Sequence, residues 1–428
     1  MTAILIALSS LIILGIPVTL AVDRRARGPL LVGTSFLYGC GLIFFTLLAL
    51  SIVHIRWTIV IVTIAVLLIW SALWFVKSPA TGDRRPAAKT HWLDLLTIWT
   101  LIGYALYATL AAVWEWDFWA ICGLKARVFF EHGGIDWRFL ESPWNVFAHP
   151  DYPLLLPFNY DFIALLNGAW SDRWLGVLMV AFAVAVLLIV RDLATQETTT
   201  FYAALITVCA STLAISRYIG LAEGPLIAFG SAGVLFLRRG LLFDDVPAWR
   251  HGAILLGLAA NVKNEGIALA VSVAIALAIV RPKTIVRLWP TAAIAAPWLL
   301  LRAAHVLPTD IVGGSVIARA ISRLPATPVI FKLLWDDLLA PWLWLAVIVG
   351  LIVAPAARRR REAFVLLVTL VQLVFYVGTY YATPHDPRWH IVTSWPRLTV
   401  QIALPLTFSV LMMLAVSFPG HAEARSVE

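Results

Sequence analysis

The sequence predicts an all-helical protein that crosses a membrane many times. Of its 428 residues, 61% are hydrophobic and only 13% are charged, whereas soluble proteins carry roughly a quarter charged residues. The mean hydropathy is +0.89. Apolar runs of about 20 residues, long enough to span a hydrocarbon core, recur from end to end. Because these runs are continuous rather than alternating, they favour helices over a membrane β-barrel.

We expect about 13 membrane spans (roughly 11–13) in a single integral membrane domain that covers residues 1–428. The first run lacks a basic region and a small-residue cleavage site, so we expect a span rather than a cleaved signal peptide. The expected spans are 2–21, 30–51, 58–76, 93–114, 174–190, 201–215, 221–238, 252–262, 266–280, 287–304, 341–354, 363–383 and 398–417. Two long connections, 115–173 and 305–340, separate groups of spans.

Basic residues are concentrated in every second connection between these spans. Those connections hold 19 of the 32 Lys and Arg residues and 10 acids, a net charge of +9, while the rest of the chain has −1. Cytoplasmic loops carry the excess of Lys and Arg in membrane proteins. We therefore expect a cytoplasmic (inner) membrane protein with its N-terminus outside, its C-terminus in the cytoplasm, and both long connections on the outer face. Because the net charge of +8 is explained by the basic connections expected in the cytoplasm, no nucleic-acid partner is expected.

Residues 252–280 allow two interpretations. One long helix would bury Lys263 and Glu265 at its middle and would place two basic stretches, RRGLLFDDVPAWRH and RPKTIVR, on opposite faces. Two short spans that meet at NVKNEG keep both basic stretches on the cytoplasmic face. The charge pattern therefore favours two spans with a turn near the outer surface.

Five polar clusters, far apart in the sequence, are expected to converge on the outer face. They are Glu115, Asp117, Lys125 and Arg127; His149, Asp151 and Tyr152; Arg217, Tyr218 and Glu223; Lys263, Asn264 and Glu265; and His385, Asp386, Arg388, His390 and Arg397. Ionisable groups near a membrane are costly unless they are paired or functional. Their convergence predicts a site built between helices.

Asp117 directly follows an expected span within the aromatic stretch WEWDFW. Partial desolvation there favours a carboxylate that accepts a proton, although an interfacial aromatic belt explains the pattern equally well. Glu115 is a support residue or a second ligand to a divalent cation. Lys125 lies about two helical turns after Asp117, so both can share one face. It either binds a phosphate or extends toward lipid head groups.

The stretch HPDYPLLLP carries three prolines, which are expected to keep it extended and to orient His149, Asp151 and Tyr152. Glu223 begins a span, where helix capping is the alternative to substrate binding. In NVKNEG, Lys263 and Glu265 either neutralise each other or, with Asn264, orient a substrate. At the start of the last span, the position of Arg397 suits a phosphate at head-group depth.

In these features the sequence resembles the GT-C fold family of polytopic membrane glycosyltransferases, which use polyprenyl-phosphate-linked sugars. The similarity covers most of residues 92–410, within a core of 92–417 that follows extra N-terminal spans in 1–91. It rests on an acid after a span (WEWDFW), an expected interfacial helix (ICGLKARVFF) and HPDYPLLLP. It also rests on GLAEGP, the KNEG break and the late arginine of WPRLTVQIALP.

The resemblance implies that Asp117 is the base that acts on the acceptor and that Lys125, Arg397 and Lys263 bind the donor phosphate. Some members hold a divalent cation, Mg, Mn or Ca, through outer-loop acids, which correspond here to Asp117 and Glu115. The sequence differs from the family in three respects. Three spans precede the one that leads to the acid, the acids are not adjacent, and no soluble domain follows the last span.

The function expected from the sequence is transfer of a sugar from a polyprenyl-phosphate donor to a hydroxyl of a lipid, glycan or protein acceptor. In this reading Glu115, His149, Asp151, Tyr152, Glu223, Asn264 and Glu265 bind the substrates, and membrane lipids surround the spans. The alternative is a transporter or flippase of a lipid-linked or anionic substrate, which would concentrate polar groups near the bilayer midplane. A second alternative transfers another group, such as phosphoethanolamine or a whole glycan.

Overall fold

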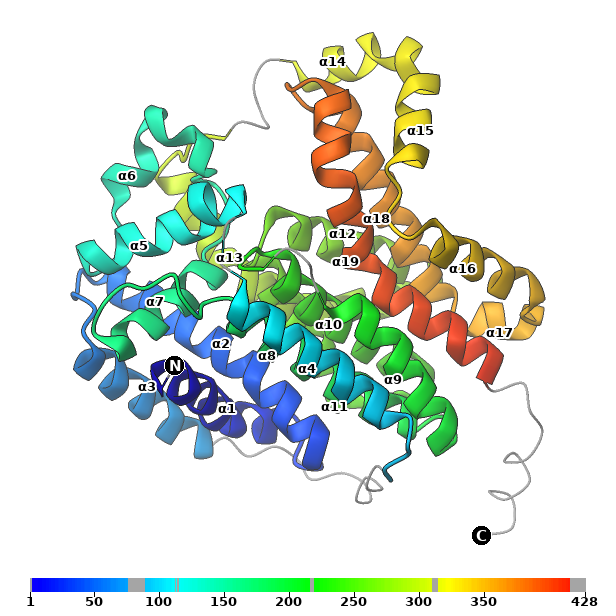
Figure 1. The fold of residues 1–428 in the computed structure, drawn as a ribbon, viewed down its shortest axis with the longest axis horizontal. Helices are drawn as coiled ribbons and strands as arrows, with labels where there is room; N and C mark the ends of the chain where they lie inside the picture. Colours follow the sequence, from blue (N-terminus) through cyan, green and yellow to red (C-terminus); the bar gives the residue numbers. More distant parts are fainter. Residues whose placement is uncertain are drawn as a thin grey trace.

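The computed structural model describes residues 2–75, 89–111, 113, 115–215, 219–309 and 315–415, and every regular element within these ranges is a helix (Figure 1). This confirms the predicted all-helical class. The main helices are α1 (Thr2–Val22), α2 (Gly28–Ile52), α3 (Ile59–Trp74), α4 (Asp94–Leu110), α8 (Val177–Thr195), α9 (Thr200–Ala214), α10 (Glu223–Phe243), α11 (Val246–Ala260), α12 (Asn264–Val280), α13 (Trp289–Ala304), α16 (Pro341–Val353), α18 (Ala363–Ala382) and α19 (Pro387–Ala415).

Each expected span overlaps one of these helices, but fewer of them are long enough to cross a membrane. Within the described residues seven are sufficiently long and apolar, α13 counting together with the turn before it (Pro282–Leu288), or eight if α15 (Thr327–Asp336), with the short turn before it, forms one broken span with α16 across a 99° bend. Helices α3, α4, α9 and α12 are apolar but shorter. The chain is therefore a multi-pass helical membrane protein with seven or eight such helices, and the count of about 13 stays a prediction.

Two helices begin well before the apolar runs that mark them in the sequence. Helix α11 begins at Val246 because the side chain of Asp245 caps it, accepting a hydrogen bond from the Ala248 amide. Helix α19 begins at Pro387 and has 29 residues, a length of about 43 Å. Arg397 therefore lies inside this helix, not at its start, because polar residues extend the helix beyond the apolar run.

Helix α10 lies in the middle of the bundle, in contact with α8, α11 and α19. Most of its residues are buried, including Glu223 at its first position and Arg238 near its end. A carboxylate and a guanidinium at the two ends of one buried helix both need partners from neighbouring helices. These two residues are therefore the centres of two polar clusters, one at each end of the bundle.

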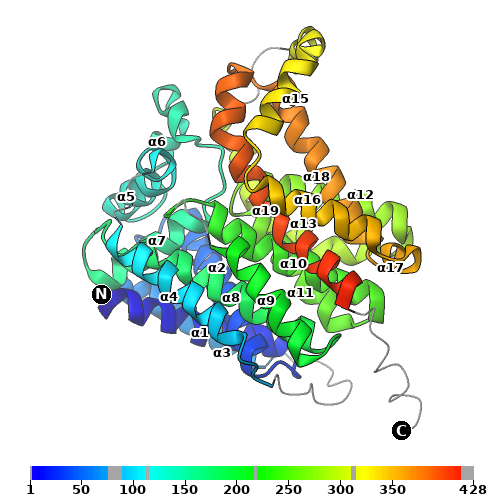
Figure 2. The same cartoon turned by 45° about the vertical axis from the view of Figure 1, so that its right-hand side comes forward.

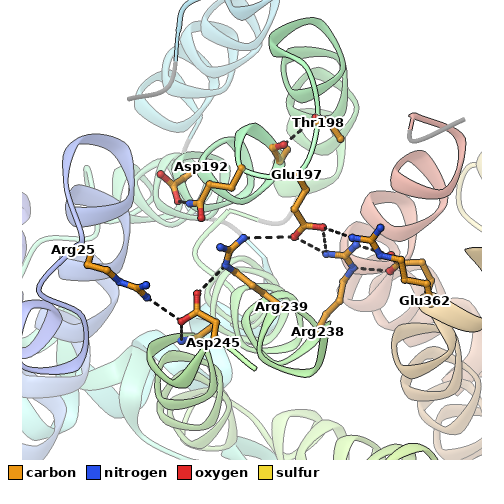
Figure 3. Close-up of polar contacts among 12 residues, drawn as sticks. Arg25, Asp192, Glu197, Thr198, Arg238, Arg239, Asp245 and Glu362 are labelled. Carbon is orange, nitrogen blue, oxygen red and sulfur yellow. Dashed lines mark hydrogen bonds and ion pairs between the residues drawn. The ribbon is translucent and has the colours of Figure 1, made fainter. Parts of the chain in front are cut away.

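At one end, which we call the basic end, four of the connections predicted to be cytoplasmic lie together (Figure 3). Arg238 bonds to Glu197 at 2.9 Å and to Glu362 at 2.5 Å. Asp245 bonds to Arg25 at 2.9 Å and to Arg239 at 3.1 Å. These contacts join the α1–α2, α8–α9, α10–α11 and α17–α18 connections, where α17 is Ala356–Arg361. Basic connections that alternate along the sequence therefore pack together at one end of the bundle.

Helices α11 and α12 form the predicted hairpin. Arg281, at the end of α12, bonds to Asp244, just before α11, at 3.0 Å. The start of α11 and the end of α12 therefore lie at the basic end, and the turn at 261–263 lies at the opposite end, called the site end below.

Two helical lobes project from the site end (Figures 1 and 2). The first is formed by α5 (Gly123–His132) and α6 (Trp137–Glu141) of the connection 115–173, whose last helix, α7 (Leu155–Asn167), packs back against α1 and α2. The second combines α14 (Val316–Ser322) and α15 with the end of α18 and the start of α19. Both long connections are thus partly helical and lie on the same side of the bundle.

Candidate functional site

The centre of the site is an ion-pair network that we call the Arg397 cluster. Arg397 donates to Oε1 of Glu223 through Nε at 2.9 Å and through Nη2 at 2.6 Å, and Nη2 also donates to the carboxylate of Asp117. Lys263 Nζ lies 3.1 Å from Glu223 Oε1 and 2.9 Å from Glu265 Oε1. Three acids and two bases from distant parts of the sequence therefore share one set of contacts.

Asp117, Glu223 and Lys263 stand at the end of an element or at a break, whereas Arg397 lies within α19. Asp117 directly precedes a π-helical turn, η1 (Phe118–Cys122), a feature frequent at functional sites. Glu223 is the first residue of α10, where a helix N-terminus favours an acid. Lys263 occupies the turn before α12 in extended backbone. The convergence predicted from charge alternation is observed for these residues and for Arg397.

A second group, the Asp151 cluster, adjoins the first through Asn264. The Asn264 amide donates to Asp151 Oδ2 at 3.1 Å, and Arg302 Nη1 donates to Asn264 Oδ1 at 3.2 Å. Arg302 also lies 3.8 Å from Asp151 Oδ2. The sequence does not single out Arg302 because it falls inside the apolar run 287–304. The only feature that could have pointed to Arg302 is its position in the last turn of a helix that reaches the site end.

Lys125 is fully buried and holds a turn of the chain in place. Its Nζ donates to the carbonyl oxygen of His149 at 2.9 Å and lies 5.7 Å from the centre of the Tyr152 ring. Lys263 Nζ lies 6.0 Å from the same ring, and His149 stacks on it at 4.6 Å. Tyr152 therefore connects Lys125 to the Arg397 cluster. In this conformation Lys125 positions the turn rather than faces a phosphate.

The prediction that three prolines keep HPDYPLLLP extended is wrong, because the first half forms a turn and the second half enters a helix. His149 is left-handed, with φ 46°, and starts a turn, and α7 begins at Leu155. Pro157 lies in the first turn of α7, where a helix tolerates proline because its missing N–H has no partner to lose. The first half still fixes the directions of Asp151 and Tyr152.

Burial lowers the pKa of Lys125 from its ordinary 10.5 to about 8. Between pH 8 and 10.5 the unfolded chain therefore binds more protons at this residue than the folded protein, so its contribution makes stability rise with pH. At about 1.4 kcal/mol per pH unit, the free energy of unfolding should rise by about 3 kcal/mol between these two pH values. The Lys125→Met variant should lose this rise. Thermal unfolding of variant and wild type at the two pH values measures it.

The exposed Lys332 provides the control for this comparison, since its side chain is 74% accessible. Lys332→Met should follow the wild-type pH profile. Parallel profiles for Lys125→Met and wild type would show that Lys125 titrates at its ordinary pH and is not desolvated.

Three carboxylate oxygens of the site are buried and accept no hydrogen bond from the described residues: Asp151 Oδ1, Glu223 Oε2 and Glu265 Oε2. A buried acceptor without a partner is costly, and most such groups in native proteins are satisfied by protein or water. Hydroxyl groups of a bound ligand are suitable donors to all three. The site therefore has acceptor capacity that the described part of the chain does not use.

An apolar cavity of about 610 Å³, called the lateral cavity below, ends at the Arg397 cluster. Helices α4, α9, α16 and α19 line it, with Trp99, Tyr104, Tyr107, Leu213, Trp342, Trp344, Val400 and Ala403 among the wall residues and Glu223 and Arg397 at its polar end. Trp99 and Trp342 are 75% and 67% exposed, so the cavity reaches the outer surface of the bundle. A long apolar chain with a charged head matches this distribution of side chains.

Some predicted site residues lie elsewhere or outside the described part of the chain. Arg217 and Tyr218 are outside the described residues. Glu115 is half-buried, and its carbonyl accepts from the amides of Phe118 and Trp119.

The residues from His385 to His390 belong to the second lobe. The carbonyl of His385 accepts from Arg323 at 2.9 Å, and the His390 ring packs on Tyr380. Arg388 is exposed, about 13 Å along α19 from Arg397 by helical rise. The stretch HDPRWHIVTSWPRL therefore supplies the site with Arg397, while its histidines pack within the second lobe.

The acids of the site do not fit a divalent cation. Asp117 already bonds to the guanidinium of Arg397, and a cation there would have to compete with this charge. Within the described ranges, no group of three or more His, Cys, Asp or Glu side chains is arranged to hold a metal ion. We therefore derive no step through a metal.

Comparison with family models, curated proteins and solved structures finds no match to this chain. The two clusters and the lateral cavity are therefore the features from which a function can be inferred.

Proposed function

We propose that the protein is a membrane glycosyltransferase that takes a sugar from a polyprenyl-phosphate donor and transfers it to a hydroxyl group. One observation carries this proposal: the apolar lateral cavity ends at Arg397, which contacts Asp117. A polyprenyl tail suits the aromatic and aliphatic wall, its phosphate suits a guanidinium, and the sugar would then lie beside the acids. The unused acceptors on Asp151, Glu223 and Glu265 suit sugar hydroxyls.

In the proposed reaction, binding of the donor changes the partners of Arg397. The phosphate draws the guanidinium away from Asp117, so the carboxylate becomes free to accept a proton. The acceptor oxygen forms a bond to the anomeric carbon while the bond from that carbon to the phosphate oxygen breaks. The acceptor proton passes to Asp117, and the electron pair leaves with the lipid phosphate, whose charge Arg397 and Lys263 stabilise.

The arrangement of charges favours an enzyme over a transporter or flippase. Asp117, Glu223, Lys263 and Arg397 cluster at one end of the bundle, and the break at 261–263 lies at that end rather than at mid-depth. Transporters place such groups near the bilayer midplane. With the basic end in the cytoplasm, as the charge rule predicts, the site faces the outer surface of the inner membrane.

The test is a transfer assay with purified protein, a panel of polyprenyl-phosphate sugars, and lipid, glycan and peptide acceptors. Asp117→Asn should reduce the transfer rate by about 10²–10⁴-fold, the contribution of a positioned general base. The control is Glu131→Gln, because Glu131 is 59% accessible and pairs with the exposed Arg127. Equal rates for Asp117→Asn and wild type would remove Asp117 as the base. No turnover of any donor, with movement of a lipid-linked sugar across vesicles, would establish the transporter instead.

A further inference from the structure

A second cavity lies beside the segment that carries Asp117. Its volume is about 580 Å³, and it is lined by the end of α4 with Thr109, by Trp119 of η1, and by Asp172, Arg173 and Trp174 before α8. The lateral cavity is also lined by α4, but its other walls come from α9, α16 and α19. The two cavities therefore reach the site end of α4 along different helices.

The second cavity combines two indole rings with an acid and a base. Trp119 is 53% exposed, and the Arg173 guanidinium packs on the Trp174 ring with its carbon 4.6 Å from the ring centre. Asp172 Oδ1 accepts from the indole of Trp170 at 2.7 Å. A sugar has apolar C–H faces that stack on flat aromatic rings and hydroxyls that bond to carboxylate and guanidinium groups. This lining provides both kinds of contact.

The backbone of Trp174 is strained, which supports a role in binding. Its φ is +79°, in the left-handed region that bulky residues rarely adopt. Such strain is retained where the surrounding structure enforces it, often at ligand sites. Trp174 is held by its neighbours, because its carbonyl accepts from Val177 at 3.0 Å and its ring is covered by Arg173. The conformation presents a fixed indole as one wall of the cavity.

We propose that the second cavity binds the carbohydrate part of the acceptor, so that the acceptor of the proposed transferase is a glycan rather than a lipid or a protein. Trp119 follows Asp117 by two residues, so their Cα atoms are at most about 7 Å apart. That distance is similar to the length of one sugar ring. Because side chains two residues apart in a helical turn do not face each other, a glycan stacked on Trp119 by one sugar reaches Asp117 with the hydroxyl of the next, terminal sugar, while the donor occupies the lateral cavity.

This inference rests on the proposed function, and its test is separable from it. Binding of glucose, mannose and galactose trisaccharides to the full-length protein in nanodiscs is measured by saturation-transfer NMR, without donor. At least one trisaccharide should bind, and Trp119→Ala should weaken it about tenfold or more, the factor expected when a stacking ring is lost. Arg173→Gln, a change at an exposed residue that should not affect folding, should weaken it as well.

Trp144→Ala is the matched control, because Trp144 is 87% exposed and lines neither cavity. The proposal is overturned if no trisaccharide binds, or if binding is the same in Trp119→Ala, Arg173→Gln and wild type. It is also overturned if phosphatidylglycerol vesicles, but not sugars, give a Trp119-dependent signal, since the cavity then binds lipid head groups.

Donor turnover to water, measured without any acceptor, tests the proposed function separately. Trisaccharide binding that depends on Trp119 without turnover of any donor would keep the carbohydrate site and remove the transferase. Turnover with trisaccharide binding that is insensitive to Trp119 and Arg173 would keep the transferase and remove the glycan site.

Discussion

Replacing Arg397 by glutamine should reduce kcat/KM for a polyprenyl-phosphate sugar by about 10²–10³-fold, the effect of removing one preorganised donor from a developing negative charge. Arg397 is the group at the polar end of the lateral cavity that also contacts both Asp117 and Glu223. Its loss removes the contact to the departing phosphate. It also leaves two acids without their guanidinium partner, so a drop in thermal stability should accompany the kinetic effect.

The matched control for this prediction is Arg388→Gln, an exposed arginine on the same helix that lies in the second lobe. It should leave both turnover and stability close to wild type. Arg397→Lys keeps the charge but cannot form the same two-pronged contact, so its activity should be intermediate. If Arg397→Gln and Arg388→Gln lower kcat/KM equally, the guanidinium of Arg397 has no special role at the phosphate.

Replacing Glu197 by glutamine should lower the free energy of unfolding by about 3–5 kcal/mol, the cost of breaking a buried ion pair. Its side chain is only 1% accessible and accepts two hydrogen bonds from Arg238, at 2.9 and 3.0 Å (Figure 3). Arg239 and Arg361 lie 3.8 and 3.6 Å from its oxygens. Removing this acid leaves three arginines of the basic end with less compensating charge, and α10 carries one of them into the core.

Thermal unfolding monitored by circular dichroism compares Glu197→Gln with Glu131→Gln. The Arg127–Glu131 pair has a similar distance, 2.9 Å, but both side chains are more than half accessible. Its loss should cost no more than about 0.5 kcal/mol. A double-mutant cycle with Arg238→Gln should show strong coupling. Similar losses for the buried and the exposed acid would mean that the basic end contributes little to stability.

Much of the helix arrangement follows from patterns within the sequence. Apolar runs locate the helices because their length is set by the hydrocarbon core. The alternation of basic connections correctly groups the ends of helices, as the contacts of Arg25, Arg239 and Arg281 at the basic end show. The same alternation separates 252–262 from 266–280 and places Lys263 with Glu223 and Arg397. Charge pattern therefore predicts which connections share an end.

The detailed contacts within the site do not follow from such patterns. Whether Lys125 faces a ligand or a carbonyl depends on the π-helical turn after Asp117 and on the left-handed His149, and neither is encoded by composition. Arg302 is hidden in an apolar run. The lateral cavity exists only because α4, α9, α16 and α19 come together, which is a property of long-range packing. The sequence predicts which kinds of chemistry its residue types can perform, but the contact partners of each residue are known only from the fold.

Photocrosslinking tests the central claim, that the lateral cavity holds the lipid of the donor, most directly. Protein in nanodiscs is irradiated with a polyprenyl phosphate that carries a diazirine in its tail, and labelled peptides are identified by mass spectrometry. Labels should concentrate at the wall of the cavity, around Leu213 and Val400, and should decrease in Arg397→Gln because the head group loses its partner. Labelling that is equally strong around Leu68, which is 67% exposed on α3 away from the cavity, and unchanged in Arg397→Gln would contradict the account.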